Sequence, residues 1–108
     1  MKSMANGTPI RINNVRVDLD ENLPDRVEQT ILDVAGTYFG RLNHGVVGFT
    51  REGHTYSCTI NLYADNLRVV IGEADADDCH QAFDRALGRV RNQLNRRKER
   101  MSANRGEQ

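Results

Sequence analysis

Four arginines and one asparagine recur at spacings of 4, 3, 4 and 4 residues in the last third of the chain: Arg85, Arg89, Asn92, Arg96 and Arg100. On an α-helix, which turns by about 100° per residue, this spacing places all five on one face over a length of about 22 Å. A guanidinium group is planar and permanently charged, so it binds the paired oxygens of a phosphate well. We call these five residues the arginine ridge and predict that it follows the phosphates of an RNA backbone.

A solvated basic surface near the end of a helix is the alternative interpretation, because the helix dipole favours cations there. That interpretation accounts for the last turn only. Arg85 and Arg89 lie farther back, and Asp84 and Glu99 are the only carboxylates in residues 79–105. Like charges four residues apart repel each other weakly, and a bound polyanion would offset that repulsion.

Charge is divided along the chain, although 15 Lys and Arg balance 15 Asp and Glu overall. Residues 79–108 carry eight basic and three acidic residues, a net charge of +5, whereas residues 1–78 carry seven and twelve, a net charge of −5. Such an asymmetry is typical of a localised polyanion-binding surface, with the acidic remainder limiting unspecific binding.

Support for catalysis or a bound metal ion is weak. The three histidines are scattered, and Cys58 and Cys79 form no Cys-x-x-Cys or Cys/His pair at metal-ligand spacing. Cys79 and His80 are neighbours on a predicted helix and point in different directions, which argues against a thiolate–imidazole pair. We predict no enzyme, no cofactor and no metal, and we expect both cysteines to be buried, reduced thiols.

The length of 108 residues and the apolar content of 38% indicate one soluble globular domain. No apolar run approaches the roughly 20 residues of a membrane span, and the first ten residues lack the apolar stretch of a secretory signal. A cytoplasmic protein is therefore expected.

The spacing of apolar residues predicts the order β-α-β-β-β-α. A first strand is expected in residues 10–17, with a bulge or turn at Asn13-Asn14, and further strands in residues 46–51 and 55–63. Leu67, Val69 and Ile71 mark a last strand that ends near Gly72. The two helices are expected in residues 20–39 and 77–100, with acidic residues at the start of each.

Three closely spaced strands favour antiparallel hairpins, and the first helix crosses between strands that can lie parallel. The last helix also carries an apolar stripe that would pack on the sheet: Cys79, Phe83, Ala86, Leu87, Val90 and Leu94. Both helices then cover one sheet face, and the other face shows Thr55, Ser57, Thr59 and Asn61. Among the tyrosines only Tyr63 lies off a predicted core face, and core packing is the favoured interpretation for the other two.

Several short segments resemble the bacterial ribosome hibernation promoting factor family, also called ribosome-associated translation inhibitors or sigma-54 modulation protein-like proteins. In the last helix they are Ala82-Phe83-Asp84, Ala86-Leu87, Arg89, Gln93-Leu94 and Arg96-Arg97-Lys98-x-Arg100. Upstream, Thr59-Ile60-x-Leu62 is similar to the family's central strand, and residues 19–27 to its first helix entry. The resemblance covers most of residues 10–101 and matches the predicted order of elements.

The resemblance implies a fold similar to a double-stranded-RNA-binding domain, a four-stranded sheet with two helices on one face. It further implies a stress factor that binds the small ribosomal subunit between head and body and inhibits translation sterically, over the sites of messenger and transfer RNA. By position, the family likeness assigns ribosomal RNA contacts to Arg89, Arg96, Arg97, Lys98 and Arg100. Arg85 is added from the helical spacing alone, and Asn92 stands where the family often has a cation.

The chain is similar to the short form of the family, which lacks the ribosome-pairing C-terminal domain. We expect residues 1–8 and 102–108 to be flexible ends around a single ribosome-binding domain of residues 9–101, monomeric away from the ribosome and without membrane contact. A general RNA-binding domain or RNA chaperone acting off the ribosome is the first alternative. A small α+β enzyme is the second, and no acid, base and nucleophile converge to support it.

Overall fold

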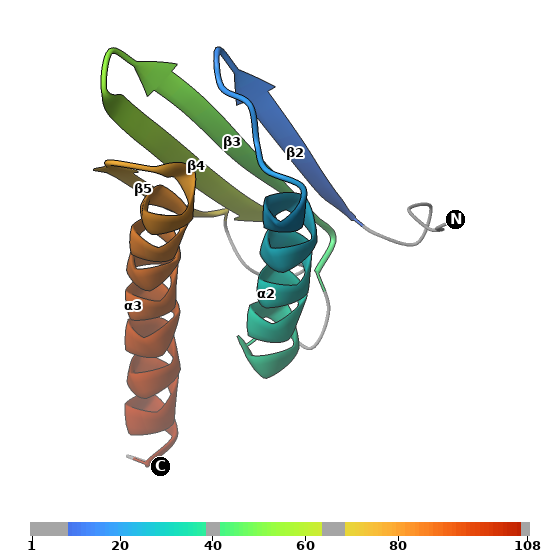
Figure 1. The fold of residues 1–108 in the computed structure, drawn as a ribbon. Coiled ribbons are helices and arrows are strands. Elements are labelled where there is room, and N and C mark those ends of the chain that lie inside the picture. Colours follow the sequence, from blue (N-terminus) through green and yellow to red (C-terminus); the bar gives the residue numbers. More distant parts are fainter. Residues whose placement is uncertain (1–8, 39–41, 64–68, 107–108) are drawn as a thin grey trace.

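The computed structural model describes residues 9–38, 42–63 and 69–106, and side chains as far as Arg96. Within these ranges the elements follow the order that the sequence predicts (Figure 1). They are β2 (Ile10–Val15), α2 (Asn22–Tyr38), β3 (His44–Glu52), β4 (Thr55–Tyr63), β5 (Val70–Ala76) and α3 (Cys79–Gly106). The predicted α+β class is confirmed.

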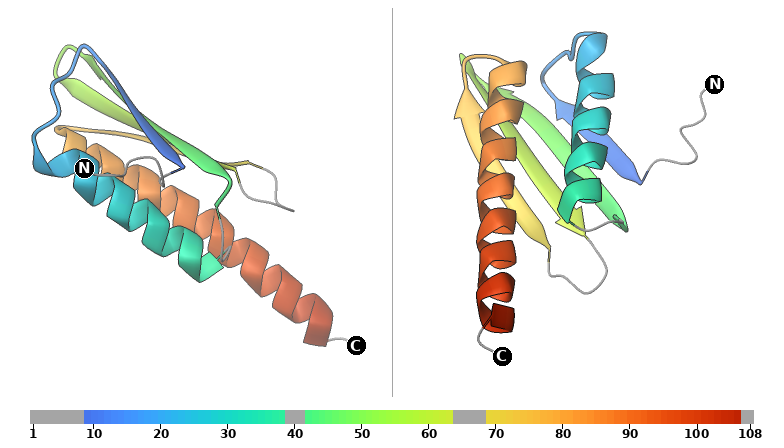
Figure 2. Two further views of the ribbon diagram at one scale, coloured as in Figure 1. Left: turned by 90° about the vertical axis from the view of Figure 1, so that its right-hand side faces the viewer. Right: turned by 90° about the horizontal axis from the view of Figure 1, so that it is seen from below.

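The four strands form one mixed sheet in the order β2-β3-β4-β5. β2 and β3 are parallel, as expected for strands joined by a helical crossover, and the other two pairs are antiparallel. Gly53 has a φ of 62° in the tight turn between β3 and β4, a conformation that glycine adopts without steric cost. Figure 2 shows both helices on the same face of the sheet, so the opposite face is open.

Strand β2 is continuous, and the predicted interruption at Asn13-Asn14 was wrong. Asn13 pairs with Gly48 and Asn14 with Phe49 without a break in register. The strand ends at Val15, and the next residue, Arg16, has a φ of 63°. Pairing with β3 therefore outweighs the low strand propensity of asparagine.

The core-facing residues of strand β5 differ from the apolar residues, Leu67, Val69 and Ile71, that marked this strand in the sequence. The buried positions are Val70, Gly72, Ala74 and Ala76, whereas Ile71 is 47% exposed. The strand also continues four residues past its predicted end at Gly72. Leu67 lies outside the described residues. Small side chains carry little hydrophobic signal, and the short distance between β5 and α3 requires them here.

Gly72 marks that short distance. A Cβ atom at this position would lie 2.4 Å from the carbonyl oxygen of Ala86 and 2.6 Å from a methyl carbon of Val90. The backbone of β5 thus approaches α3 more closely than any side chain would permit. This contact fixes α3 along the edge of the sheet.

The core lies between the open sheet and the two helices. Sheet residues such as Phe49, Ile60 and Leu62 are fully buried against helix residues that include Leu23 and Phe83. All six residues of the predicted apolar stripe of α3 are buried, which confirms the assignment of that face. On β4, the alternating residues Thr55, Ser57, Thr59 and Asn61 lie on the open face, as predicted.

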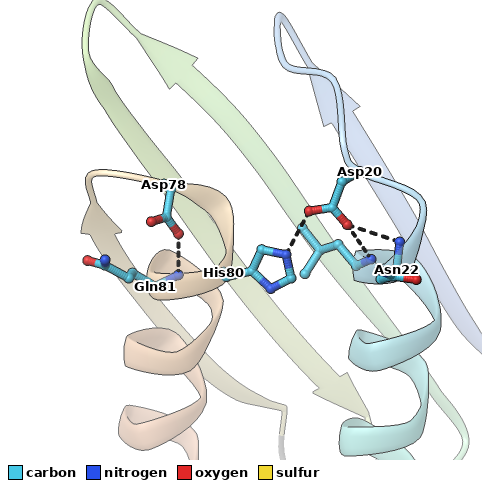
Figure 3. A network of polar contacts seen from close by, with 6 residues as sticks. Asp20, Asn22, Asp78, His80 and Gln81 are labelled. Atoms are coloured by element: carbon cyan, nitrogen blue, oxygen red, sulfur yellow. Dashed lines mark hydrogen bonds and ion pairs between the residues drawn. The ribbon is translucent and has the colours of Figure 1, made fainter.

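The two helices begin side by side, and an ion pair joins their N-terminal ends (Figure 3). The carboxylate of Asp20 accepts hydrogen bonds at 3.0 Å from the backbone N–H groups of Asn22 and Leu23, and its other oxygen lies 2.8 Å from Nε2 of His80. The hydrogen bond to His80 is the main reason that the pKa of Asp20 is lowered. Asp78 caps α3 through the N–H of Gln81, which confirms an acidic residue at the start of this helix.

Helix α3 extends to Gly106, six residues past its predicted end at Arg100 and into the segment expected to be a flexible tail. Residues 97–101 are Arg, Lys, Glu, Arg and Met, all of which favour an α-helix, so the helix continues through them.

Among the helices of the described residues, none has the length and hydrophobicity that a membrane span requires.

Both cysteines are free and buried, as predicted. Burial raises the pKa of the Cys58 thiol to about 12 and also raises the pKa of Cys79. Thiols with such pKa values carry almost no thiolate at neutral pH and are poor nucleophiles. Their role is packing.

Candidate nucleic-acid interface

As far as Arg96, the arginine ridge lies on the exposed side of α3, next to the edge strand β5. Arg85, Arg89, Asn92 and Arg96 are all exposed, while the apolar stripe on the other side of the same helix is buried. The helix therefore separates its packing and polar surfaces as the sequence predicts. The side chains of Arg97, Lys98 and Arg100 lie outside the described set, so their predicted contacts remain predictions.

Two side chains of α3 bind the outward carbonyl groups of β5. Nη1 of Arg85 donates a hydrogen bond to the carbonyl oxygen of Asp75 at 2.9 Å, and Nε2 of Gln93 donates one to that of Ile71 at 2.6 Å. Eight residues along the helix span about 12 Å and four along a strand about 13 Å, so the two elements stay in register. Arg85 thus has a structural partner that sequence reasoning did not foresee, and Gln93 was missed as an interface residue.

Arg89 lies midway between Arg85 and Gln93 on α3. Glu73 lies midway between their two hydrogen-bond acceptors on β5. A hollow of about 400 Å³ lies there between α3 and β5, lined by Ile71, Gly72, Glu73, Arg89, Asn92, Gln93 and Arg96. Among the side chains that the structure describes, Arg89 and Arg96 form no hydrogen bond or ion pair. Their guanidinium groups are therefore available to an external anion, and Glu73 is the one carboxylate in the lining.

The nearest acid on α3 is turned away from the ridge. Asp84 pairs with Arg26 of α2 at 2.5 Å, and the guanidinium of Arg26 lies 5.5 Å from the ring centre of Phe83. Asp84 thus holds the two helices together instead of neutralising Arg85 or Arg89. Among the described residues, Arg89 and Arg96 are thus left without an ion-pair partner.

The chemistry available to this surface is binding. Guanidinium groups and the Asn92 amide offer hydrogen-bond donors to phosphate oxygens and to the edges of bases. Within the described ranges, no three His, Cys, Asp or Glu side chains gather where they could hold a metal ion. The arrangement fits a phosphate backbone that runs along α3.

A family model described as "Sigma 54 modulation protein / S30EA ribosomal protein" matches residues 10–102. The chain belongs to this family. Proteins of the Sigma 54 modulation / S30EA family bind ribosomes and modulate translation without catalysing a reaction. The family resemblance seen in the sequence and the prediction of a non-enzyme are thereby confirmed.

Two solved structures have the same fold as this Sigma 54 modulation / S30EA family member. A ribosomal subunit interface protein from Coxiella burnetii is 15% identical with a TM-score of 0.71, and the match covers 83% of this chain and 97% of that one. The N-terminal domain of Protein Y from Thermus thermophilus is 22% identical with a TM-score of 0.69, covering 80% and 93%. No curated protein is similar enough to match. At these identities the likeness concerns the fold.

Proposed function

We propose that this family member is a stress or hibernation factor of the bacterial cytoplasm that binds the small ribosomal subunit. It occupies the channel of messenger and transfer RNA and inhibits translation sterically, without chemistry. The protein acts as a monomer away from the ribosome. Family membership supports the ribosome as the partner, and the ridge supports RNA as the surface that is bound.

The observation that carries the proposal is the uncompensated charge of Arg89 and Arg96 beside the β5 edge. Both side chains line the hollow at β5 and have no partner among the described side chains. Asn92 lies between them and supplies an amide in place of a third cation. Arg100 would extend the same contact toward the end of α3, because it continues the spacing of the ridge. Arg97 and Lys98 fall on other sides of the helix by that spacing and would reach RNA from the flanks. Arg85 contributes less because it is already bound to Asp75.

Co-sedimentation with purified small subunits tests the partner. The protein should sediment with the subunits, and a large excess of duplex RNA should leave most of it bound, because a specific site offers more than phosphate charge. Loss of subunit binding to the duplex competitor would instead identify a general RNA-binding protein acting off the ribosome.

A matched pair of charge reversals tests the surface. Arg89→Glu should weaken binding to the small subunit by about tenfold or more, because repulsion replaces attraction at the ridge. Arg91→Glu makes the same charge change two residues away, on the flank of α3 that carries Asp84, and should have a clearly smaller effect. Equal losses from both variants would show that total charge, and not the ridge, determines binding.

A further inference from the structure

Three polar or aromatic side chains lie near one corner of the open sheet face, the face that the helices do not cover. His44 at the start of β3 pairs in register with Tyr63 at the end of β4, and their ring centres lie 4.4 Å apart at a tilt of 38°. Arg11 is exposed on β2 and pairs in register with Val46, two residues after His44 on β3. Figure 1 shows that β2 and β3 begin, and β4 ends, at this same end of the sheet. We call Arg11, His44 and Tyr63 the corner cluster.

The corner is exposed, and the described residues that line it include no acidic side chain. Tyr63 is 40% exposed and His44 is also exposed, so the rings are not covered by the core or by either helix. A hollow of about 640 Å³ adjoins His44 and Arg11, and its lining consists of Pro9, Ile10, Arg11, His44, Gly45 and Val46. The acidic residues of the open face on β5, Glu73 and Asp75, lie toward the other end of the sheet.

Cross-strand packing explains part of the ring pair, since aromatic neighbours stabilise antiparallel strands. It does not explain why the pair lies at an exposed corner beside an arginine. An aromatic face next to a guanidinium is the combination that binds unpaired bases, because every base offers a face for stacking and its phosphate needs a cation.

The corner is also continuous with the ridge. Arg11, Val46, Asn61 and Ile71 are register partners on the open face of successive strands. Strands lie about 4.8 Å apart, so this row crosses about 14 Å of sheet. It ends at Ile71, which lines the hollow that holds Arg89 and Arg96. One RNA chain can therefore contact both surfaces.

We propose that the corner cluster binds an unpaired RNA nucleotide, whose base stacks on Tyr63 and His44 and whose phosphate contacts Arg11. This inference rests on the proposed function for its source of RNA, and it adds the recognition of a single-stranded segment to the phosphate contacts of the ridge. A duplex cannot occupy the corner in this way, because its bases are already stacked.

Stacking is tested with the full chain and a short single-stranded RNA that contains 2-aminopurine, a base analogue whose fluorescence falls when it stacks. The wild-type protein should quench the fluorescence. Tyr63→Leu should weaken binding about 5- to 100-fold and remove the quench, whereas Tyr63→Phe keeps the ring and should retain both. Thr59→Ala, on the same face of β4, should behave as wild type. Unchanged affinity and quenching in Tyr63→Leu would overturn the proposal.

A second measurement, the binding of each variant to small subunits, distinguishes the contribution of the corner cluster from that of the ridge. Arg11→Ala and Tyr63→Leu should each reduce subunit binding, with circular dichroism equal to that of the wild type. If Arg89→Glu reduces subunit binding and the two corner variants do not, the corner proposal is wrong and the proposed function stands. If the corner variants lose the quench on single-stranded RNA while the wild type fails to bind subunits, the corner proposal stands and the proposed function is wrong.

Discussion

Gly72, at the close contact between β5 and α3, has no room for a side chain. A methyl group there would meet the Ala86 carbonyl at 2.4 Å, and a backbone atom cannot swing aside as a side-chain tip can. We expect Gly72→Ala to lower the free energy of unfolding by about 1–3 kcal/mol, as overpacked cores do. Urea unfolding measures this difference.

Gly48 provides the matched control, because a Cβ atom on it would meet nothing within 4 Å. Gly48→Ala should be neutral or slightly stabilising, since alanine reduces the entropy of the unfolded chain. Equal urea midpoints for the two alanine variants would show that β5 and α3 can move apart without cost.

Asp20 links pH to stability at the helix starts. Its pKa is lowered in the folded chain from the ordinary value of 3.8, chiefly by the hydrogen bond to His80. The carboxylate therefore stabilises the fold above pH 3.8, and this contribution is lost as the pH falls through the lower, folded-state pKa. Wild-type stability should thus fall more steeply below about pH 4 than that of Asp20→Asn.

Thermal unfolding between pH 6 and pH 3 measures that difference. Asp33→Asn serves as the control, because Asp33 is exposed on α2 and its carboxylate forms no hydrogen bond among the described residues. The same pH dependence in Asp20→Asn and the wild type would mean that the pair with His80 does not contribute to stability.

At the scale of elements, the alignment of α3 with β5 divides the ridge into two kinds of arginine. Arg85 is bound to the Asp75 carbonyl, while Arg89 has no partner among the described side chains. Arg85→Ala should therefore lower the free energy of unfolding by about 0.5–1.5 kcal/mol, the usual net value of one hydrogen bond. Arg89→Ala should change stability less and weaken binding to the small subunit more.

Urea unfolding and subunit co-sedimentation of the two alanine variants together check this division. Both variants remove the same side chain from the same helix face, so each serves as the control for the other. The opposite ranking in either measurement would contradict the assignment of Arg85 to the sheet edge.

The elements that the sequence predicts well are those whose pattern is local. The strict alternation along β4 and the apolar stripe of α3 each define a face without knowledge of any neighbour. β5 was harder, since three of its four buried residues are the small Gly72, Ala74 and Ala76, and they pack against a helix that comes later in the chain. The roles of Arg85 and Gln93 depend on the same neighbourhood, because a helical wheel does not show which strand edge lies beside it.

For the whole molecule, the division of charge follows the architecture. Residues 79–108 carry the net +5, and α3 presents the described part of that charge along one edge of the sheet, while residues 1–78 carry −5. The open face adds Arg11 at the far corner. We therefore expect a polyanion to be attracted to the α3 edge and across one end of the sheet, although the formal charges of the whole chain cancel.

Directed cleavage of ribosomal RNA tests the central claim most directly. Asn92→Cys places a thiol on the ridge for a tethered iron chelate, and the native Cys58 and Cys79 are only 0% and 9% exposed, so the new thiol reacts first. Val15→Cys, at a site that is 55% exposed on β2, is the control. We predict strong cuts from position 92 in the small-subunit RNA that lines the channel of messenger and transfer RNA, and weaker cuts from position 15. Cuts from position 92 that fall outside this channel, or that are no stronger than those from position 15, would contradict the account.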